Sequence, residues 1–460
     1  MKVTVISGSP KGDKSVTLQY VHFIQKKFPQ HEFNIFHVGQ KIKKIEKEEK
    51  AFQEVVDEVK VSDAVLWAFP LYYLLVPSQY KRFIELIWEK GGAGFFKNKY
   101  TAVLSTSIHF FDHTAHNYMN AICDDLDMKY LGSFSAAMYD LLSRKGREKW
   151  TLFASEFFES IQNHVPTSKK YSPVLYRTFE YVPGPVEQKI CTQGKKALIL
   201  TDLKEPQTNL DKMIERFKNS FMDKVKVTNL HQVDIKGGCL GCIQCGYDYQ
   251  CSYGDQDEYV QFYKDQVKTA DILIFAGTIQ DRYLSSRWKM FFDRSFFHTH
   301  TPSLTGKQVA FILSGPLRQI PNLRQILEAY TEWQQANLVD IITDEEDSMV
   351  LDGRLQYLAK MVIHLAEKHY FKPNTFLGVG GMKIFRDDVW GKLRFPFQAD
   401  HRFYKEHRLY DFPQRDYKAR MTNSLLMLLT KIPSMRKEIY RKRMKEEMVK
   451  PFQKVVQRVE

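Results

Sequence analysis

The opening of the chain, residues 3–17, predicts a strand, a tight polar loop and a helix. Val3 to Ile6 is a short β-branched run, typical of a buried strand, and a turn of Gly, Ser and Pro follows it. Apolar residues then recur at helical spacing from Leu18 to Phe28. The first N–H groups of such a helix lack partners and carry partial positive charge. The segment therefore predicts either a site for one phosphate monoester or an ordinary capped turn. The side chains available to an anion are Ser9, Lys11, Lys14, Ser15 and Thr17.

Strand and helix patterns alternate through the first half of the chain. Strands are expected at 32–38, 62–70 and 100–107, with one helix at about 43–59 and another that contains Phe83, Ile84 and Ile87. This alternation is typical of a parallel, doubly wound sheet, in which ligands bind beyond the carboxyl ends of the strands.

The same pattern recurs later in the chain, which indicates an internal repeat. Ala197–Thr201 corresponds to Val3–Ser7 with an offset of 194 residues, and Asp271–Ala276 corresponds to Asp63–Ala68 with an offset of 208. The difference of 14 residues is close to the length of a cysteine-bearing stretch, 237–251. The second copy therefore reads as the first copy with a cysteine loop inserted.

A chain of 460 residues is long enough for two or three domains. Two prolines near residue 184 indicate a linker between the copies. We predict domains at 1–180 and 195–345, and a helical C-terminal extension at 350–460. Within the extension, the glycine-rich stretch 378–387 predicts a tight turn, with an anion site as the alternative.

The charge and hydropathy patterns argue against nucleic-acid and membrane partners. The chain has 67 Lys and Arg against 54 Asp and Glu, a net charge of +13, but the basic residues are spread widely. The densest basic run, 436–447, is interleaved with Glu and is typical of a solvated helix face. The longest apolar run, 425–429, is too short to span a bilayer, and no signal-peptide core opens the chain. We expect a cytoplasmic protein.

Two loops of the first copy resemble those of a known family, the flavodoxin-like NAD(P)H-dependent FMN reductases. Gly8-Ser9-Pro10-Lys11 resembles the phosphate loop of that family, with Lys11 where the family usually has Arg. Phe69-Pro70-Leu71-Tyr72-Tyr73 resembles the Pro-x-Tyr loop that packs on the isoalloxazine ring. The resemblance covers about 1–140 and 195–340. The cofactor-binding residues that it implies are Ser9, Lys11, Ser15, Val16, Thr17, Pro70, Leu71, Tyr72, Tyr73, Thr106 and Ser107.

The resemblance implies an α/β fold with two tandem flavodoxin-like domains, each a doubly wound parallel sheet, followed by the helical extension. The second copy lacks the Gly-Ser-Pro turn and has Asp202 and Glu205 where an anion would bind. Negative charge at that position disfavours a phosphate. We therefore predict one FMN per chain, in the first copy.

The second copy carries a cysteine motif with the spacing C-x2-C-x2-C-x5-C. Its members are Cys239, Cys242, Cys245 and Cys251. The motif resembles that of the iron–sulfur flavoproteins, which implies these four thiolates as ligands of a 4Fe-4S cluster. A vestigial thiol loop and a zinc site are the alternatives.

The activity implied by the resemblance is hydride transfer from NAD(P)H to FMN, with electrons passing to a quinone, a nitro compound or an electron carrier. No side chain needs to act as an acid or base. One alternative is an iron–sulfur flavoprotein that exchanges electrons with a ferredoxin-like partner, and another is a non-enzymatic scaffold. The resemblance is compatible with a homodimer, and the duplication suggests an internal pseudo-dimer.

Overall fold

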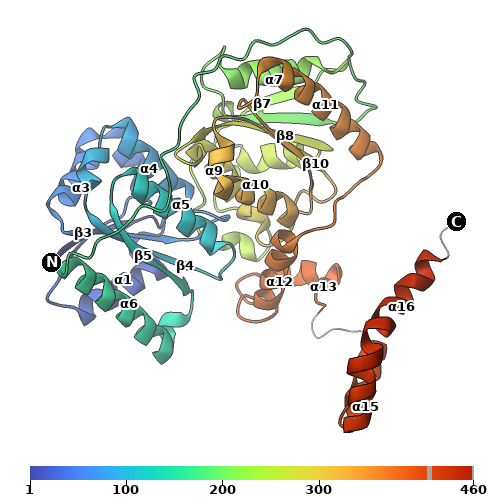
Figure 1. The fold of residues 1–460 in the computed structure, drawn as a ribbon. Helices are drawn as coiled ribbons and strands as arrows, with labels where there is room; N and C mark the ends of the chain where they lie inside the picture. The colour runs from blue at the N-terminus through green and yellow to red at the C-terminus, as the bar shows by residue number, and fades with distance from the viewer. Residues whose placement is uncertain (412–416, 458–460) are drawn as a thin grey trace. The chain divides into compact units, whose positions relative to one another are not determined.

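The computed structural model describes residues 1–411 and 417–457, and they form two compact units. The larger unit, 1–403, contains both sheets, and the smaller unit, 404–460, contains helices (Figure 1). The domain boundaries predicted from the sequence stay a prediction.

The first sheet has five parallel strands in the order β2-β1-β3-β4-β5. This order is that of flavodoxin, in which the direction of the strand order reverses between β1 and β3. The interior strands are almost fully buried because helices cover both faces. Figure 1 shows α1 and α6 on one face and α3, α4 and α5 on the other. The strands are β1 (Lys2–Ser7), β2 (Glu32–Phe36), β3 (Ala64–Pro70), β4 (Tyr100–Ser107) and β5 (Lys129–Ala137).

The second sheet has the equivalent order, β7-β6-β8-β10-β11, with the short β9 pairing antiparallel to β8. Its register follows the sequence repeat: Val3 pairs with Ala64 in the first sheet, and Ala197 pairs with Ile272 in the second. The predicted fold class is confirmed. The strands are β6 (Ala197–Thr201), β7 (Lys226–Asn229), β8 (Ile272–Gln280), β9 (Tyr283–Leu284), β10 (Gln308–Ser314) and β11 (Asn337–Thr343).

The helices around the first sheet bury one apolar stripe each. One core is formed by the sheet with α1 and α6, and it contains Leu18, Val21, Trp150 and Phe158. The helix predicted at 43–59 is divided at Glu48 into two helices. The helices are α1 (Val16–Lys27), α2 (Ile42–Lys47), α3 (Glu49–Val61), α4 (Ser78–Glu89), α5 (Asp112–Asp125) and α6 (Arg144–Gln162).

The helices around the second sheet repeat this arrangement, with α7 and α11 forming a core against one face. The last helix of this set, α11, thus packs on the second sheet as α6 packs on the first. The helices are α7 (Asn209–Asn219), α8 (Tyr259–Phe262), α9 (Ser286–Arg294), α10 (Pro321–Trp333) and α11 (Ser348–Glu367).

The glycine-rich stretch 378–387 lies inside a helix, α12 (Phe376–Trp390), so the predicted turn is wrong. The helix crosses close to the Phe110 ring, and a Cβ on Gly381 would lie 2.6 Å from that ring. Here glycine serves close packing of a helix and not a turn. The next helix is α13 (Gln398–Glu406).

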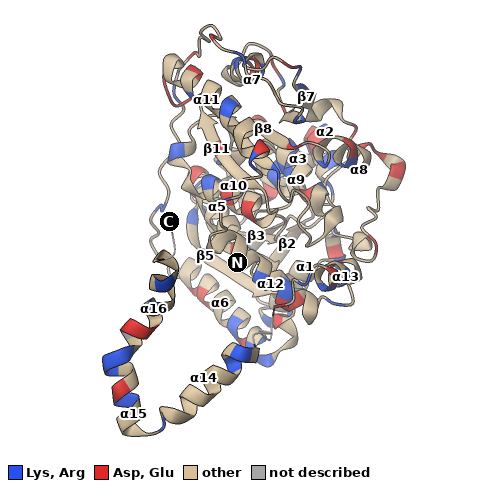
Figure 2. Ribbon diagram, turned by 90° about the vertical axis from the view of Figure 1, so that its right-hand side faces the viewer, with Lys and Arg blue, Asp and Glu red and all other residues tan. Residues whose placement is uncertain are grey.

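The smaller unit contains α14 (Tyr417–Leu429), α15 (Pro433–Lys437) and α16 (Met444–Val456), with α15 joining the two longer helices (Figure 2). None of the helices that the structure describes is both long and apolar enough to cross a bilayer.

Candidate functional site

The predicted phosphate loop connects β1 to α1 at the carboxyl edge of the first sheet. Ser9, Ser15 and Thr17 are buried, whereas Val16 is exposed. Ser15 precedes the first turn of α1, and its hydroxyl caps no N–H group there. The hydroxyl of Ser7 is also buried, without a hydrogen-bond partner in the described part of the chain. The loop thus presents buried hydroxyls at a helix start.

Lys11 adds a cation to this loop. Burial lowers the pKa of its amine, while the nearby thiols of Cys239 and Cys242 act in the opposite direction. Its backbone N–H donates to the Ser9 hydroxyl at 3.3 Å. Among residues 1–411 and 417–457, no carboxylate forms an ion pair with Lys11. A half-buried cation without a carboxylate partner among the described residues, on the same loop as buried hydroxyls, is the kind of residue set that binds a phosphate.

The second predicted loop, at the end of β3, lies beside the end of β4. The Leu71 N–H donates to the Thr106 carbonyl at 3.0 Å, and the hydroxyls of Thr106 and Thr17 are 2.6 Å apart. Thr106 therefore links the ring loop to the phosphate loop. Ser107 is half-buried and accepts a hydrogen bond from the His109 N–H at 2.9 Å.

The two tyrosines of this loop point to different surroundings. The Tyr72 hydroxyl is buried and has no partner within the described residues; burial raises its pKa well above the usual range, and the neighbouring Cys239 adds to this. The Tyr73 ring packs against Phe296 and Trp333 of the second copy, with ring centroids 6.2 and 5.5 Å apart. Only Tyr72 of this pair has an unused polar group at the site.

The cysteine loop of the second copy lies directly against these two loops. A Cβ on Gly241 would be 1.9 Å from the Tyr72 hydroxyl and 2.9 Å from Cε of Lys11. The side-chain amide of Gln79, in α4, donates to the Cys239 carbonyl at 3.0 Å. Glycine at 241, at φ +62°, therefore allows one copy to close over the candidate site of the other.

The four cysteines do not form a metal site in this arrangement. No group of three His, Cys, Asp or Glu side chains suited to a metal ion occurs among the described residues. All four thiols are free. Burial raises the pKa of the Cys239 thiol to about 12 and also raises that of Cys245.

The equivalent loop of the second copy is filled by its own side chain. Asp202 follows β6, is buried, and accepts a hydrogen bond from the Ser285 hydroxyl. Burial raises the pKa of the Asp202 carboxyl. A buried carboxyl group held at this position disfavours a phosphate there.

Some residues that position the site were not identified from the sequence. The Lys289 amine donates to the Tyr72 carbonyl at 2.9 Å and pairs with Asp293 in α9. Asp293 in turn accepts from the Ser78 N–H at the start of α4. By the 208-residue offset Lys289 corresponds to Lys81, and this equivalence is a signal for the residue that the sequence contains.

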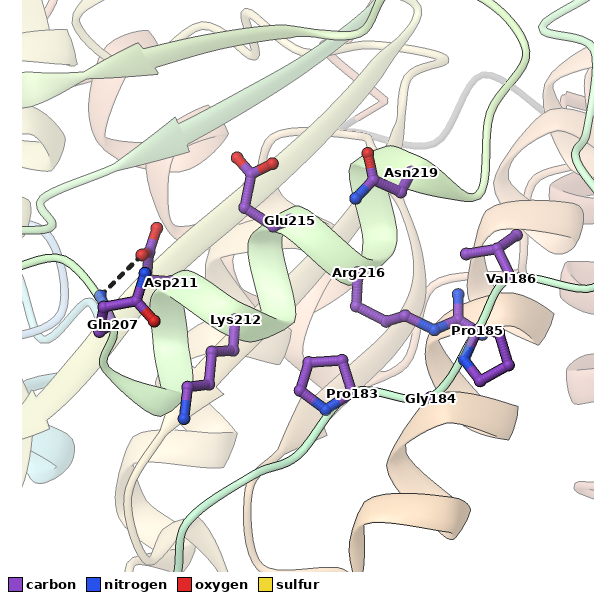
Figure 3. Close-up of a pocket in the computed structure, with 10 residues that line it drawn as sticks. All are labelled: Pro183, Gly184, Pro185, Val186, Gln207, Asp211, Lys212, Glu215, Arg216 and Asn219. Carbon is purple, nitrogen blue, oxygen red and sulfur yellow. Dashed lines mark hydrogen bonds between the residues drawn. The ribbon is translucent and has the colours of Figure 1, made fainter.

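A pocket of about 370 Å³ lies elsewhere, between the segment 183–186 and α7 (Figure 3). The cations that line it have partners: Lys212 pairs with Glu180 at 2.8 Å, and Arg216 with Asp352 at 3.1 Å. Figure 3 shows the Arg216 side chain extended towards Pro185. Its partner Asp352, in α11, also accepts a hydrogen bond from the Gly184 N–H at 2.8 Å, so this carboxylate links α7 to the connecting segment. The pocket is therefore a gap between packed elements, and its two cations already serve ion pairs within the chain.

Residues 1–140 match the family model described as NADPH-dependent FMN reductase. No curated protein sequence matches the chain. Among solved structures, the flavoenzyme NAD(P)H:(acceptor) oxidoreductase FerB from Paracoccus denitrificans is 21% identical, with a TM-score of 0.30, and the match covers 35% of this chain and 98% of FerB.

Two further solved structures are each 14% identical, with TM-scores of 0.27. They are an FMN-dependent NADH-azoreductase from Bacillus anthracis, matched over 36% of this chain and 99% of that chain, and an NAD(P)H:quinone oxidoreductase from Methanothermobacter marburgensis, over 36% and 98%. The family match is confined to residues 1–140, the part of the chain that forms the first sheet, and the strand order of that sheet is that of flavodoxin.

Proposed function

We propose that this chain is an NAD(P)H-dependent FMN oxidoreductase. It would bind one FMN at the β1–α1 loop and pass electrons to a small acceptor such as a quinone or a nitro compound. The observation that carries this proposal is Lys11, a half-buried cation without a carboxylate partner in the described residues, on the same loop as the buried hydroxyls of Ser9 and Ser15.

The residues divide into two groups by the part of FMN that they would hold. Lys11, Ser9, Ser15 and the first N–H groups of α1 bind the phosphate. Tyr72, the backbone from Pro70 to Tyr73 and the edge at Thr106 and Ser107 hold the ring, while the side chain of Tyr73 braces the loop. Bound FMN supplies the redox chemistry, by accepting hydride from a pyridine nucleotide. The chain supplies binding, orientation and shielding from water.

We also propose that the two copies form an internal pseudo-dimer. Helices α4 and α9 are equivalent by the 208-residue offset and pack against each other. The second copy has lost its own phosphate loop and contributes its cysteine loop to cover the site of the first. One complete site per chain follows from this asymmetry.

The test is FMN binding by Lys11→Ala, with Lys14→Ala as the matched control. Lys14 lies in the same loop but is exposed. Loss of a charge-assisted bond to phosphate should raise the dissociation constant for FMN by about 10- to 100-fold in Lys11→Ala. The Lys14 variant should change it by less than about threefold. Flavin fluorescence titration measures both.

Two results would contradict the proposal. If the unsubstituted chain does not bind FMN, the assignment as an FMN reductase is wrong. If the two variants weaken FMN equally, the phosphate does not bind at Lys11. Steady-state oxidation of NADH and NADPH with a quinone then tests the reductase activity separately.

An iron–sulfur electron-transfer module is the second candidate that the sequence motif suggested. It finds no support in the positions of the four thiols, as described above. Iron and acid-labile sulfide, measured on anaerobically purified protein, separate the two candidates: about four irons per chain would favour the module.

A further inference from the structure

The helices of the smaller unit each expose a stripe of apolar side chains, and in α14 Leu426 and Met427 are exposed outside that stripe. In α14, the side chains of Tyr417, Met421, Leu425 and Leu428 recur at positions i, i+4, i+8 and i+11, and each is at least 59% exposed. This spacing puts them on one side of a helix.

The last helix, α16, repeats the pattern. Met444, Met448, Phe452 and Val455 have the same i, i+4, i+8 and i+11 spacing, and the last three are at least 65% exposed. Lys450 and Lys454 lie on the other side of α16. Two amphipathic helices in succession, both with uncovered apolar faces, indicate a surface that binds something.

The charge of this unit indicates what it binds. Residues 417–457 contain 11 Lys and Arg and three Asp and Glu, so they contribute +8 to a chain whose net charge is +13. The basic residues gather around α15, where Arg436, Lys437 and Arg441 are exposed (Figure 2). Basic and apolar side chains together match an anionic lipid surface.

The lengths of the helices specify the mode of binding. Each of α14 and α16 has 13 residues, and neither is long enough to cross the hydrocarbon core. The sequence-based expectation of no membrane partner relied on that spanning length. A helix that lies in the interface does not need it.

We propose that residues 417–457 bind the surface of a membrane that contains anionic lipids. The apolar faces of α14 and α16 enter the boundary between headgroups and acyl chains, and the Lys and Arg side chains contact lipid phosphates. A second copy of this chain fits the surface less well, because two units of +8 repel each other. The proposal stands independently of FMN.

The experiment is cosedimentation of the full chain with vesicles of phosphatidylcholine alone or with about one quarter phosphatidylglycerol. We expect binding to the anionic vesicles, weaker binding to the neutral ones, and loss at high salt because screening weakens the charge contacts. Substituting Arg436, Lys437 and Arg441 by Glu should weaken partitioning by about 100-fold or more.

The matched control changes the same amount of charge on the larger unit. Lys26, Lys27 and Lys145 are exposed there, and their substitution by Glu should leave vesicle binding within about threefold of the unsubstituted chain. A third variant, Leu425→Ser with Phe452→Ser, should also reduce binding, since it removes apolar contact at unchanged charge. Thermal unfolding shows whether each variant remains folded.

Three outcomes would overturn the proposal. The first is that the chain fails to bind anionic vesicles and is monomeric by light scattering, which would mean that the chain itself or a protein partner covers the helices. The second is that the chain is a dimer that the Leu425 and Phe452 substitutions dissociate, which would mean that a second copy of the chain covers these helices. The third is that the Glu variants of the smaller unit and of the larger unit lose vesicle binding equally, which would mean that the attraction comes from the overall charge and not from residues 417–457.

Discussion

The carboxylate of Asp293 accepts a hydrogen bond of 2.7 Å from the backbone N–H of Ser78, the first residue of α4. The equivalent bond joins Glu85 to the N–H of Ser286, the first residue of α9, at 2.6 Å. Each helix therefore has its first N–H satisfied by a carboxylate of the other helix. Both pairs obey the same 208-residue offset, so the packing of α4 on α9 is reciprocal.

We expect Asp293→Ala to destabilise the chain strongly. Asp293 is the buried ion-pair partner of Lys289, and its removal leaves a buried amine with only the Tyr72 carbonyl. Breaking such a pair costs about 3–5 kcal/mol. The control is Glu89→Ala, because Glu89 pairs with Arg82 at the surface and should contribute about 1 kcal/mol or less. Urea unfolding measures both, and losses of equal size would contradict the prediction.

We expect Gly241→Ala to destabilise more than Gly254→Ala. Both glycines have positive φ, +62° and +50°, so both substitutions incur backbone strain. Only at Gly241 would the new Cβ collide with the Tyr72 hydroxyl, whereas nothing lies within 4 Å at Gly254. The additional cost should be about 1–3 kcal/mol.

Thermal unfolding of the two glycine variants measures this difference. Tyr72→Phe removes the hydroxyl that the Cβ meets, so Gly241→Ala should be less destabilising in that background. If the two glycine variants unfold alike, the cysteine loop does not lie on Tyr72.

We expect one FMN per chain. The second loop is filled by Asp202, which is buried with Ser285. FMN released by denaturing the saturated protein should equal the protein in molar amount. Asp202→Ser should leave that ratio at one, because the loop also lacks the Gly-Ser-Pro turn, and a ratio near two would show that both copies bind.

We expect stability to fall between about pH 6.5 and pH 4 through His116. Burial is the main reason why the pKa of this imidazole is lowered to about 4. The charge of Asp112 raises the pKa, whereas the charges of His113 and His109 lower it further. The unfolded chain takes up a proton near pH 6.5, so in this window it binds more protons than the folded chain. The stabilisation is thus complete above pH 6.5 and lost as the pH falls, by up to about 3 kcal/mol.

Urea unfolding of the unsubstituted chain and of His116→Gln at several pH values checks this. Glutamine can keep a hydrogen bond to Ser105, the partner of His116 at 2.7 Å, but it does not titrate. The variant should therefore show a shallower dependence on pH. Parallel curves for the two proteins would refute the role of His116.

The sequence by itself determined the two sheets and predicted the phosphate loop, which stays a prediction. Apolar runs such as Val3–Ile6 and Ala197–Leu200 identify strands because burial on both faces demands continuous apolar side chains. The 194 and 208 offsets indicated the repeat, and the structure shows the same offsets in the strand registers. The turn of Gly8, Ser9 and Pro10 before a helix indicated an anion site because its chemistry is local.

Only the tertiary structure decided what lies against that loop. The positions of Gly241 on Tyr72, of Tyr73 on Trp333 and of Asp293 on α4 depend on contacts between residues more than 150 positions apart. Local periodicity carries no signal for such pairs. The glycines at 378–381 indicated a turn from the sequence, but in the structure they lie in a helix, where Gly381 allows close approach to the Phe110 ring. The site's candidate groups are local in sequence, but its cover is assembled by the packing of one copy on the other.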